Sequence, residues 1–110
     1  MENVISIGSR TMVSPSEVVY FVADSNYTHV HFKNGDKILV ATNLKIIEDR
    51  FANCKYFFRP NRSFFINLNF AEFEESCSML KIKDQASVLV SRRRKPLLIN
   101  ALIKSNLNKL

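Results

Sequence analysis

Hydrophobic and polar residues alternate with a period of two over much of this chain, which is the pattern of half-buried β-strands. β-Branched and aromatic residues are frequent in the same segments, and we expect strands at residues 4–7, 11–13, 17–23, 27–33, 37–41, 79–83 and 87–90. The alternation divides strand 27–33 into two faces, which are Thr28, Val30 and Phe32 on one side and Tyr27, His29, His31 and Lys33 on the other.

Turn-forming residues separate these strands. Ser14-Pro15-Ser16 closes the second strand, and Asp24-Ser25-Asn26 lies between the third and the fourth. Asn34-Gly35 is the strongest hairpin signal of the chain; because both residues tolerate positive φ, it predicts a two-residue type I′ turn. The last two strands form a second predicted hairpin, joined by Asp84-Gln85-Ala86.

Residues 56–68 (YFFRPNRSFFINL) follow neither period. Their apolar residues come in pairs, and Pro60 interrupts any strand ladder. We interpret this segment as two short extended pieces around an irregular basic loop.

Two helices complete the prediction. Thr42 or Asn43 is a suitable N-cap for a short helix that runs through Phe51, with Leu44, Ile47 and Phe51 on one face. Pro96 suits the first turn of a C-terminal helix, whose apolar stripe is Leu98, Ala101 and Leu102. The sequence thus predicts a mainly β fold with two short α-helices, in a single domain over residues 1–110.

The composition of the chain indicates a class of binding partner. The chain has 110 residues, with 16 Lys and Arg against 10 Asp and Glu, a net charge of +6 and a pI of about 9.6. Such a balance in a small domain favours a polyanionic partner, either nucleic acid or an anionic surface. No apolar run is long enough to cross a membrane, no secretion signal opens the chain, and two cysteines suit a reducing compartment, so we expect a cytoplasmic protein.

The basic residues are clustered. Arg92-Arg93-Arg94-Lys95 lies between the last strand and the last helix, and Arg59 and Arg62 flank Pro60. A single basic run is usually a solvated loop. This one precedes a helix N-terminus, which attracts anions, and the arginine fork can bind a phosphate or the guanine edge with two parallel hydrogen bonds.

Little in the sequence indicates metal binding or catalysis. His29 and His31 share a strand face, but two ligands do not make a metal site, so we expect no metal and no cofactor. No catalytic motif is present, and we expect no enzyme. We expect Cys54 and Cys77 to be buried or half-buried small hydrophobes. Asn26, Tyr27 and His29 lie beside a turn, where a protruding loop could enter a nucleic-acid groove.

Taken together, five motifs in order resemble the LytTR-type DNA-binding domain, the output domain of bacterial response regulators. They are residues 19–27 (VYFVADSNY), Asn34-Gly35, the short helix 44–51, residues 58–68 (FRPNRSFFINL) and residues 90–94 (VSRRR). The resemblance covers residues 4–107. It departs from the family at Asn61, where His is usual, and at Asp84-Gln85-Ala86, where Asn-Gly is commoner.

The resemblance implies elongated antiparallel β-sheets whose loops enter successive major grooves of double-stranded DNA. It also implies paired direct-repeat sites bound by a homodimer, and an upstream receiver or sensor domain, which these 110 residues do not include. Carried over by motif, the DNA-binding residues are Asn26, Tyr27, Thr28, His29, Asn61, Arg62, Ser63, Arg92, Arg93, Arg94 and Lys95. Arg93 is the first choice for a base contact.

Two other functions stay open. A single-stranded nucleic-acid binder would stack bases on Tyr27, Tyr56 and the phenylalanines of residues 57–65, although most phenylalanines pack in cores. A basic protein-interaction module would dock the arginine cluster on an acidic partner or an anionic lipid. A thiol- or metal-dependent sensor is a more distant alternative.

Overall fold

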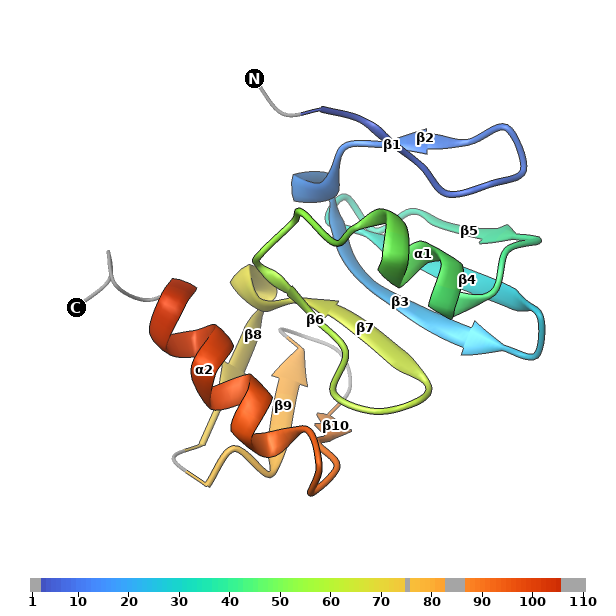
Figure 1. Cartoon of the computed structure of the whole chain (residues 1–110). Coiled ribbons are helices and arrows are strands. Elements are labelled where there is room, and N and C mark those ends of the chain that lie inside the picture. The colour runs from blue at the N-terminus through green and yellow to red at the C-terminus, as the bar shows by residue number, and fades with distance from the viewer. Residues whose placement is uncertain (1–2, 75, 83–86, 106–110) are drawn as a thin grey trace.

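The computed structural model describes residues 3–74, 76–82 and 87–105 (Figure 1). In these residues the chain is mainly antiparallel β-sheet with two α-helices, as the sequence predicts. The elements are β1 (Ile5–Ser6), β2 (Met12–Val13), β3 (Val18–Asp24), β4 (Tyr27–Phe32), β5 (Lys37–Val40), α1 (Leu44–Arg50), β6 (Phe57–Phe58), β7 (Phe64–Asn67), β8 (Ala71–Phe73), β9 (Met79–Ile82), β10 (Ser87–Leu89) and α2 (Lys95–Ser105). Short 3₁₀ turns lie at Pro15–Glu17 and Leu68–Phe70.

A five-stranded sheet in the order β5-β4-β3-β7-β6 is the centre of the molecule. Its middle strand β3 has the sequence VVYFVAD, which is apolar on both faces because both faces of the sheet are covered. Tyr20 and Phe21 are successive residues of β3 that point to opposite sides, and both are buried. The predicted strand 17–23 is therefore confirmed as a core strand.

The β4–β5 hairpin is confirmed, but its predicted two-residue type I′ turn is wrong. The N–H of Phe32 donates to the carbonyl of Asp36 at 2.9 Å, and the N–H of Gly35 donates to the carbonyl of Phe32 at 3.0 Å. Gly35 has φ of +94°, whereas Asn34 is not among the positive-φ residues, and its Oδ1 accepts the N–H of Asp36 at 2.9 Å. This is a three-residue loop, in which a turn is followed by a left-handed glycine.

Helix α1 begins where the sequence places it. Asn43 is the N-cap, and its Oδ1 accepts the N–H of Ile46 at 3.0 Å. The predicted apolar face, Leu44, Ile47 and Phe51, is buried against the central sheet. An N-cap bond of this kind stabilises a helix by about 1 kcal/mol, which matters for a helix as short as α1.

The second sheet has the order β10-β9-β8 and lies with α2 on the other side of the molecule (Figure 1). Strands β9 and β10 pair as predicted, and the connecting residues Asp84, Gln85 and Ala86 lie outside the described residues. Pro96 is the second residue of α2, as expected, and Leu98 and Leu102 are buried. Strand β8 was not predicted.

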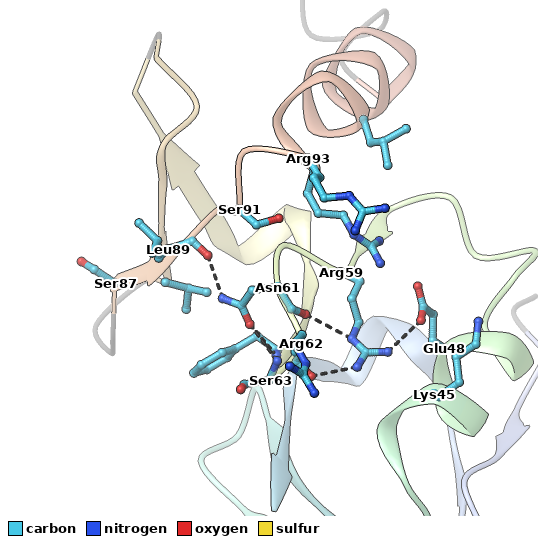
Figure 2. Close-up of a pocket in the computed structure, with 14 residues that line it drawn as sticks. Lys45, Glu48, Arg59, Asn61, Arg62, Ser63, Ser87, Leu89, Ser91 and Arg93 are labelled. Atoms are coloured by element: carbon cyan, nitrogen blue, oxygen red, sulfur yellow. Dashed lines mark hydrogen bonds and ion pairs between the residues drawn. The ribbon is translucent and has the colours of Figure 1, made fainter.

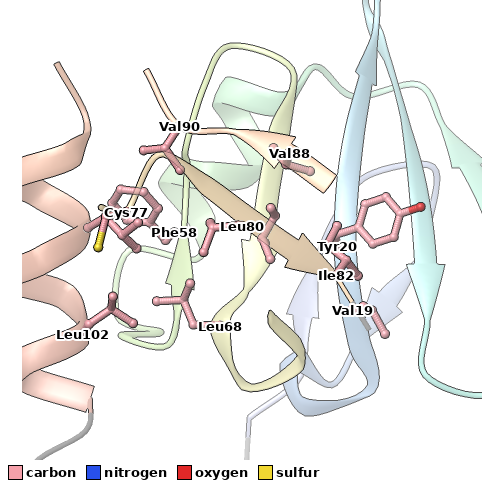
Figure 3. Packing of buried hydrophobic residues seen from close by; sticks show 12 residues of the cluster. Val19, Tyr20, Phe58, Leu68, Cys77, Leu80, Ile82, Val88, Val90 and Leu102 are labelled. Carbon is pink, nitrogen blue, oxygen red and sulfur yellow. The ribbon is translucent and has the colours of Figure 1, made fainter. Parts of the chain in front are cut away.

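Buried side chains form two clusters, one on each face of the central sheet. One cluster joins the sheet to α1 and to the β1–β2 ribbon, and includes Phe21, Ile47 and Phe65. The other joins the sheet to the β8–β10 sheet and α2, and includes Tyr20, Ile66 and Leu80 (Figure 3). The sheet is thus a shared wall between two cores. Cys77 is buried and Cys54 half-buried, as expected.

The β1–β2 ribbon packs closely over Thr42, the residue before the N-cap of α1. Gly8 has φ of +88°, and a Cβ built on it would overlap the Oγ1 atom of Thr42. Thr42 is itself buried, and its carbonyl accepts the hydroxyl of Thr28 at 2.6 Å. In the described residues, no helix is long and apolar enough to cross a membrane.

Candidate nucleic-acid interface

Three loops that the sequence marks as candidate DNA contacts lie side by side in the structure. They are the β3–β4 turn (Ser25 and Asn26), the loop formed by residues 59–63, and the arginine turn of residues 92–94. The N–H of Ala23, at the end of β3, donates to the carbonyl of Ser63 at 2.8 Å. The N–H of Ser91 donates to the carbonyl of Pro60 at 3.0 Å. The middle loop is thus hydrogen-bonded to the end of β3, next to the β3–β4 turn, and to the residue that precedes the arginine turn.

The β3–β4 turn presents some of its predicted residues and buries one. Asn26 is exposed, Tyr27 is 49% exposed, and His29 is half-buried with its Nε2 atom 2.9 Å from the Oδ2 atom of Asp24. Thr28 is completely buried, because it lies on the inward face of β4 with Val30. Its hydroxyl already donates to the carbonyl of Thr42. Thr28 therefore offers no side-chain surface to a ligand.

His31, the second histidine of β4, stacks on Tyr20 with ring centroids 4.1 Å apart. Burial lowers the pKa of His31, and its neighbours Lys37 and His29 lower it further. Burial raises the pKa of the Tyr20 hydroxyl. The lowered pKa favours the neutral form of His31 at pH 7. In the part of the chain that is described, no three His, Cys, Asp or Glu side chains cluster as a metal site would need.

The side chain of Asn61 organises loop 59–63. Its Oδ1 atom accepts the N–H groups of Ser63 at 2.8 Å and Phe64 at 3.1 Å. Its Nδ2 atom donates to the carbonyl of Leu89 in β10 at 2.7 Å (Figure 2). Asn61 thus holds the loop in shape, while the neighbouring Arg62 and Ser63 are exposed.

Arg59, which the sequence shows only as part of a basic loop, is mostly buried. Its Nη1 atom lies 2.8 Å from Oε1 of Glu48 in α1, and only 14% of its side chain is exposed. Its Nε and Nη2 atoms donate to the carbonyls of Asn61 and Arg62 at 3.2 and 2.8 Å. Sequence reasoning missed this role, because nothing in a run of basic residues tells which charge turns inward.

The arginine turn leads directly into α2. The carbonyl of Ser91 accepts the N–H groups of Arg94 and Lys95, at 3.0 and 3.1 Å. Arg92 and Arg93 are exposed, whereas Arg94 and Lys95 are half-buried. The first turn of α2 contains no acidic residue, so its positive end adds to the arginine charges.

A groove of about 1040 Å³ separates α1 from the start of α2, with loop 59–63 between them (Figure 2). The charged residues that line it are Lys45, Glu48, Arg59, Arg62, Arg93 and Arg94. Glu48 is neutralised by Arg59 and Lys45 pairs with the exposed Asp49, and within the described residues neither Arg62 nor Arg93 forms an ion pair. The groove is therefore strongly positive. Lys45 joins it from α1, a placement that only the folded chain shows.

The aromatic residues that could have stacked bases are mostly inside. Phe57, Phe58 and Phe65 are buried, and Phe64 and Tyr56 are half-buried. Tyr27 alone among this predicted set is well exposed. A continuous stacking platform for single-stranded nucleic acid is not formed by these side chains.

Nearly the whole chain matches a known protein family. The family model that matches is that of the LytTr DNA-binding domain, and the match covers residues 8–103. The chain belongs to the LytTR family. Membership confirms the resemblance seen in the motifs, and with it DNA binding in transcription regulation.

A solved LytTR structure has the same fold. It is described as "LytTr DNA-binding domain of putative methyl-accepting/DNA response regulator from Bacillus cereus", with a TM-score of 0.67 and 20% sequence identity. The match covers 93% of this chain and 98% of that one. No curated protein sequence matches this LytTR domain.

Proposed function

We propose that this LytTR domain binds a specific sequence in double-stranded DNA, and that its three adjacent loops read the major groove. The observation that supports this most is that loop 59–63 is hydrogen-bonded to Ala23 at the end of β3 and to Ser91 before the arginine turn, which keeps the three loops together. Arg62, Arg92 and Arg93 are exposed on these loops and form no ion pair with another of the described residues. A row of loops on a rigid scaffold can follow the surface of a duplex.

Some side chains of these loops would supply affinity, and others would supply sequence specificity. Lysine and arginine neutralise phosphates and supply affinity that depends on salt but not on sequence. Side chains that reach base edges supply the preference. We assign base contact first to Arg93, which is exposed just before α2, with Arg62, Ser63, Asn26 and Tyr27 as further contacts. We assign Arg94 and Lys95, at the start of α2, to phosphate contacts.

We further propose that two copies bind neighbouring half-sites in direct repeat, and that a receiver or sensor domain controls them. Support for both comes from the family resemblance. Half-sites about one helical turn apart would present the same groove face to each copy.

Selection of bound sequences from a random duplex library, at about 0.15 M salt where weak phosphate binding is suppressed, tests the proposal. We expect recovery of two similar half-motifs in direct repeat. Recovery of no motif, with binding that disappears as salt rises, would leave only a basic surface and favour a protein-interaction module. Recovery only from single-stranded pools would favour the stacking alternative.

Two neighbouring substitutions separate base reading from phosphate binding. Arg93→Ala should cost about 1–3 kcal/mol on the selected site and relax the preference at one position, because a base contact is lost. Lys95→Ala should weaken binding to all duplexes alike and reduce the salt slope by about one unit. Titration of both variants against the selected and a scrambled duplex measures this. Equal losses on both duplexes for Arg93→Ala would show that Arg93 reads no base.

A further inference from the structure

Loop 59–63 satisfies most of its peptide oxygens with donors from the protein itself. Four successive carbonyl groups accept hydrogen bonds from inside the protein, and they belong to Pro60, Asn61, Arg62 and Ser63. The donors of the first and last of these bonds are the N–H groups of Ser91 and Ala23. The donor of the two middle bonds is the single guanidinium group of Arg59.

This arrangement suits a surface that meets a polyanion. A carbonyl oxygen carries a partial negative charge, so a carbonyl facing a phosphate would be repelled and would lose its water without a partner. Because these carbonyls are already hydrogen-bonded within the protein, the exposed side chains of Arg62 and Ser63 are left to meet the ligand. The orientation of two of these four carbonyls depends on Arg59.

The guanidinium of Arg59 is well suited to this task. Its planar fork donates in several fixed directions at once, here to two carbonyls and to the Oε1 atom of Glu48 at 2.8 Å. Both partners of the ion pair are largely removed from solvent, with 14% of the Arg59 side chain and 24% of the Glu48 side chain exposed. Glu48 lies on α1, so the pair fixes the loop against a rigid helix (Figure 2).

We propose that Arg59 is a positioning residue for sequence recognition. Held by Glu48, it sets the conformation of loop 59–63 and so aims Arg62 and Ser63 at the bases, without touching DNA itself. This inference rests on the proposed function, and it names two residues that determine specificity from beneath the contact surface.

Glu48→Gln gives the sharpest test, because two explanations of the role of Glu48 predict opposite changes in DNA affinity. If Glu48 acted only through its charge, removing a carboxylate near a polyanion would tighten binding to every duplex. If it positions Arg59, Glu48→Gln should weaken binding to the selected duplex about tenfold, since a charge-assisted hydrogen bond is lost. Asp49→Asn is the matched control, because Asp49 is exposed and pairs with Lys45 rather than with the loop.

Arg59→Lys tests the fork itself. It keeps the positive charge, but one ammonium group cannot hold two carbonyls and a carboxylate in the same plane. We expect the ratio of affinities for the selected and the scrambled duplex to fall about tenfold. The slope of binding against salt should stay as in the unmodified protein, because no phosphate contact is removed. Thermal melts of each variant show whether it is folded.

The outcomes are distinct. If Glu48→Gln tightens binding to both duplexes as Asp49→Asn does, or if Arg59→Lys keeps the affinity ratio, the positioning role is wrong. If Arg59→Lys lowers the salt slope by about one unit, Arg59 binds phosphate instead. If the unmodified domain itself fails to distinguish the two duplexes, the proposed function fails, and the positioning role fails with it.

Discussion

At the scale of single residues, the two glycines of the chain differ in a way that stability measurements can separate. Both have positive φ, which an L-residue adopts at a cost of about 1–2 kcal/mol. A Cβ on Gly35 would meet nothing within 4 Å, whereas one on Gly8 would overlap Thr42 Oγ1. We expect Gly35→Ala to lower the free energy of unfolding by about 1–2 kcal/mol, and Gly8→Ala to lower it by about 2–4 kcal/mol.

Urea denaturation of the two variants measures the difference directly. Since the backbone cost is common to both, the excess for Gly8→Ala reports the contact between the β1–β2 ribbon and Thr42. Equal losses in the two variants would mean that the ribbon moves away at no cost.

Local sequence patterns predict the position of some residues of the site but not of others. The alternation in strand 27–33 already placed Thr28 on the face of Val30, and the structure buries both. The motif resemblance nevertheless carried Thr28 over as a contact residue. Asn61 and Arg59 could not be sorted in advance, because their hydrogen-bond partners in β10 and α1 are distant in sequence.

At the scale of elements, α2 carries the arginine turn and depends on a few buried side chains. Leu98 is completely buried, whereas its neighbour Leu97 is 52% exposed on the groove side. Leu98→Ala should destabilise the domain by about 2–5 kcal/mol, because it leaves a cavity between α2 and the β8–β10 sheet. Leu97→Ala should change stability by no more than about 0.5 kcal/mol. Thermal or urea unfolding of this adjacent pair provides the measurement, and similar losses would show that α2 packs differently.

Most elements could be predicted because their signals are local. The N-cap at Asn43, Pro96 in α2 and the β-branched run of β3 each follow from neighbouring residues. Strand β8 could not, because it has three residues, two of them exposed, and exists through its pairing with β9. The β4–β5 turn differs from the prediction because the Asn34 side chain bonds Asp36 and leaves positive φ to Gly35 alone.

At the scale of the whole molecule, the two hydrophobic clusters share the central sheet and should unfold together. Ile47 represents the cluster under α1, and Leu80 the cluster under α2. We expect Ile47→Val to cost about 0.5–1.5 kcal/mol and Leu80→Ala about 2–5 kcal/mol, each lowering one common transition. Both clusters contain residues of β3 and β7, so unfolding of one cluster would expose the sheet on which the other packs.

Methyl NMR signals from both clusters, followed through a urea titration, check this. Within each protein all signals should disappear with one common midpoint, and that midpoint should be lower in each variant than in the unmodified domain. Persistence of one set of signals at a urea concentration that removes the other would show two independent folding units.

Strand β7 limits how the length of this chain can vary. Phe65 and Ile66 are neighbours in β7, and they belong to opposite cores. A deletion or insertion of one residue before them would exchange their faces, placing each side chain in the space shaped for the other. Length changes in β7 are thus confined to pairs of residues or excluded. In a population of related genes, gaps should fall in the connections between strands, and β7 should keep its spacing from β3.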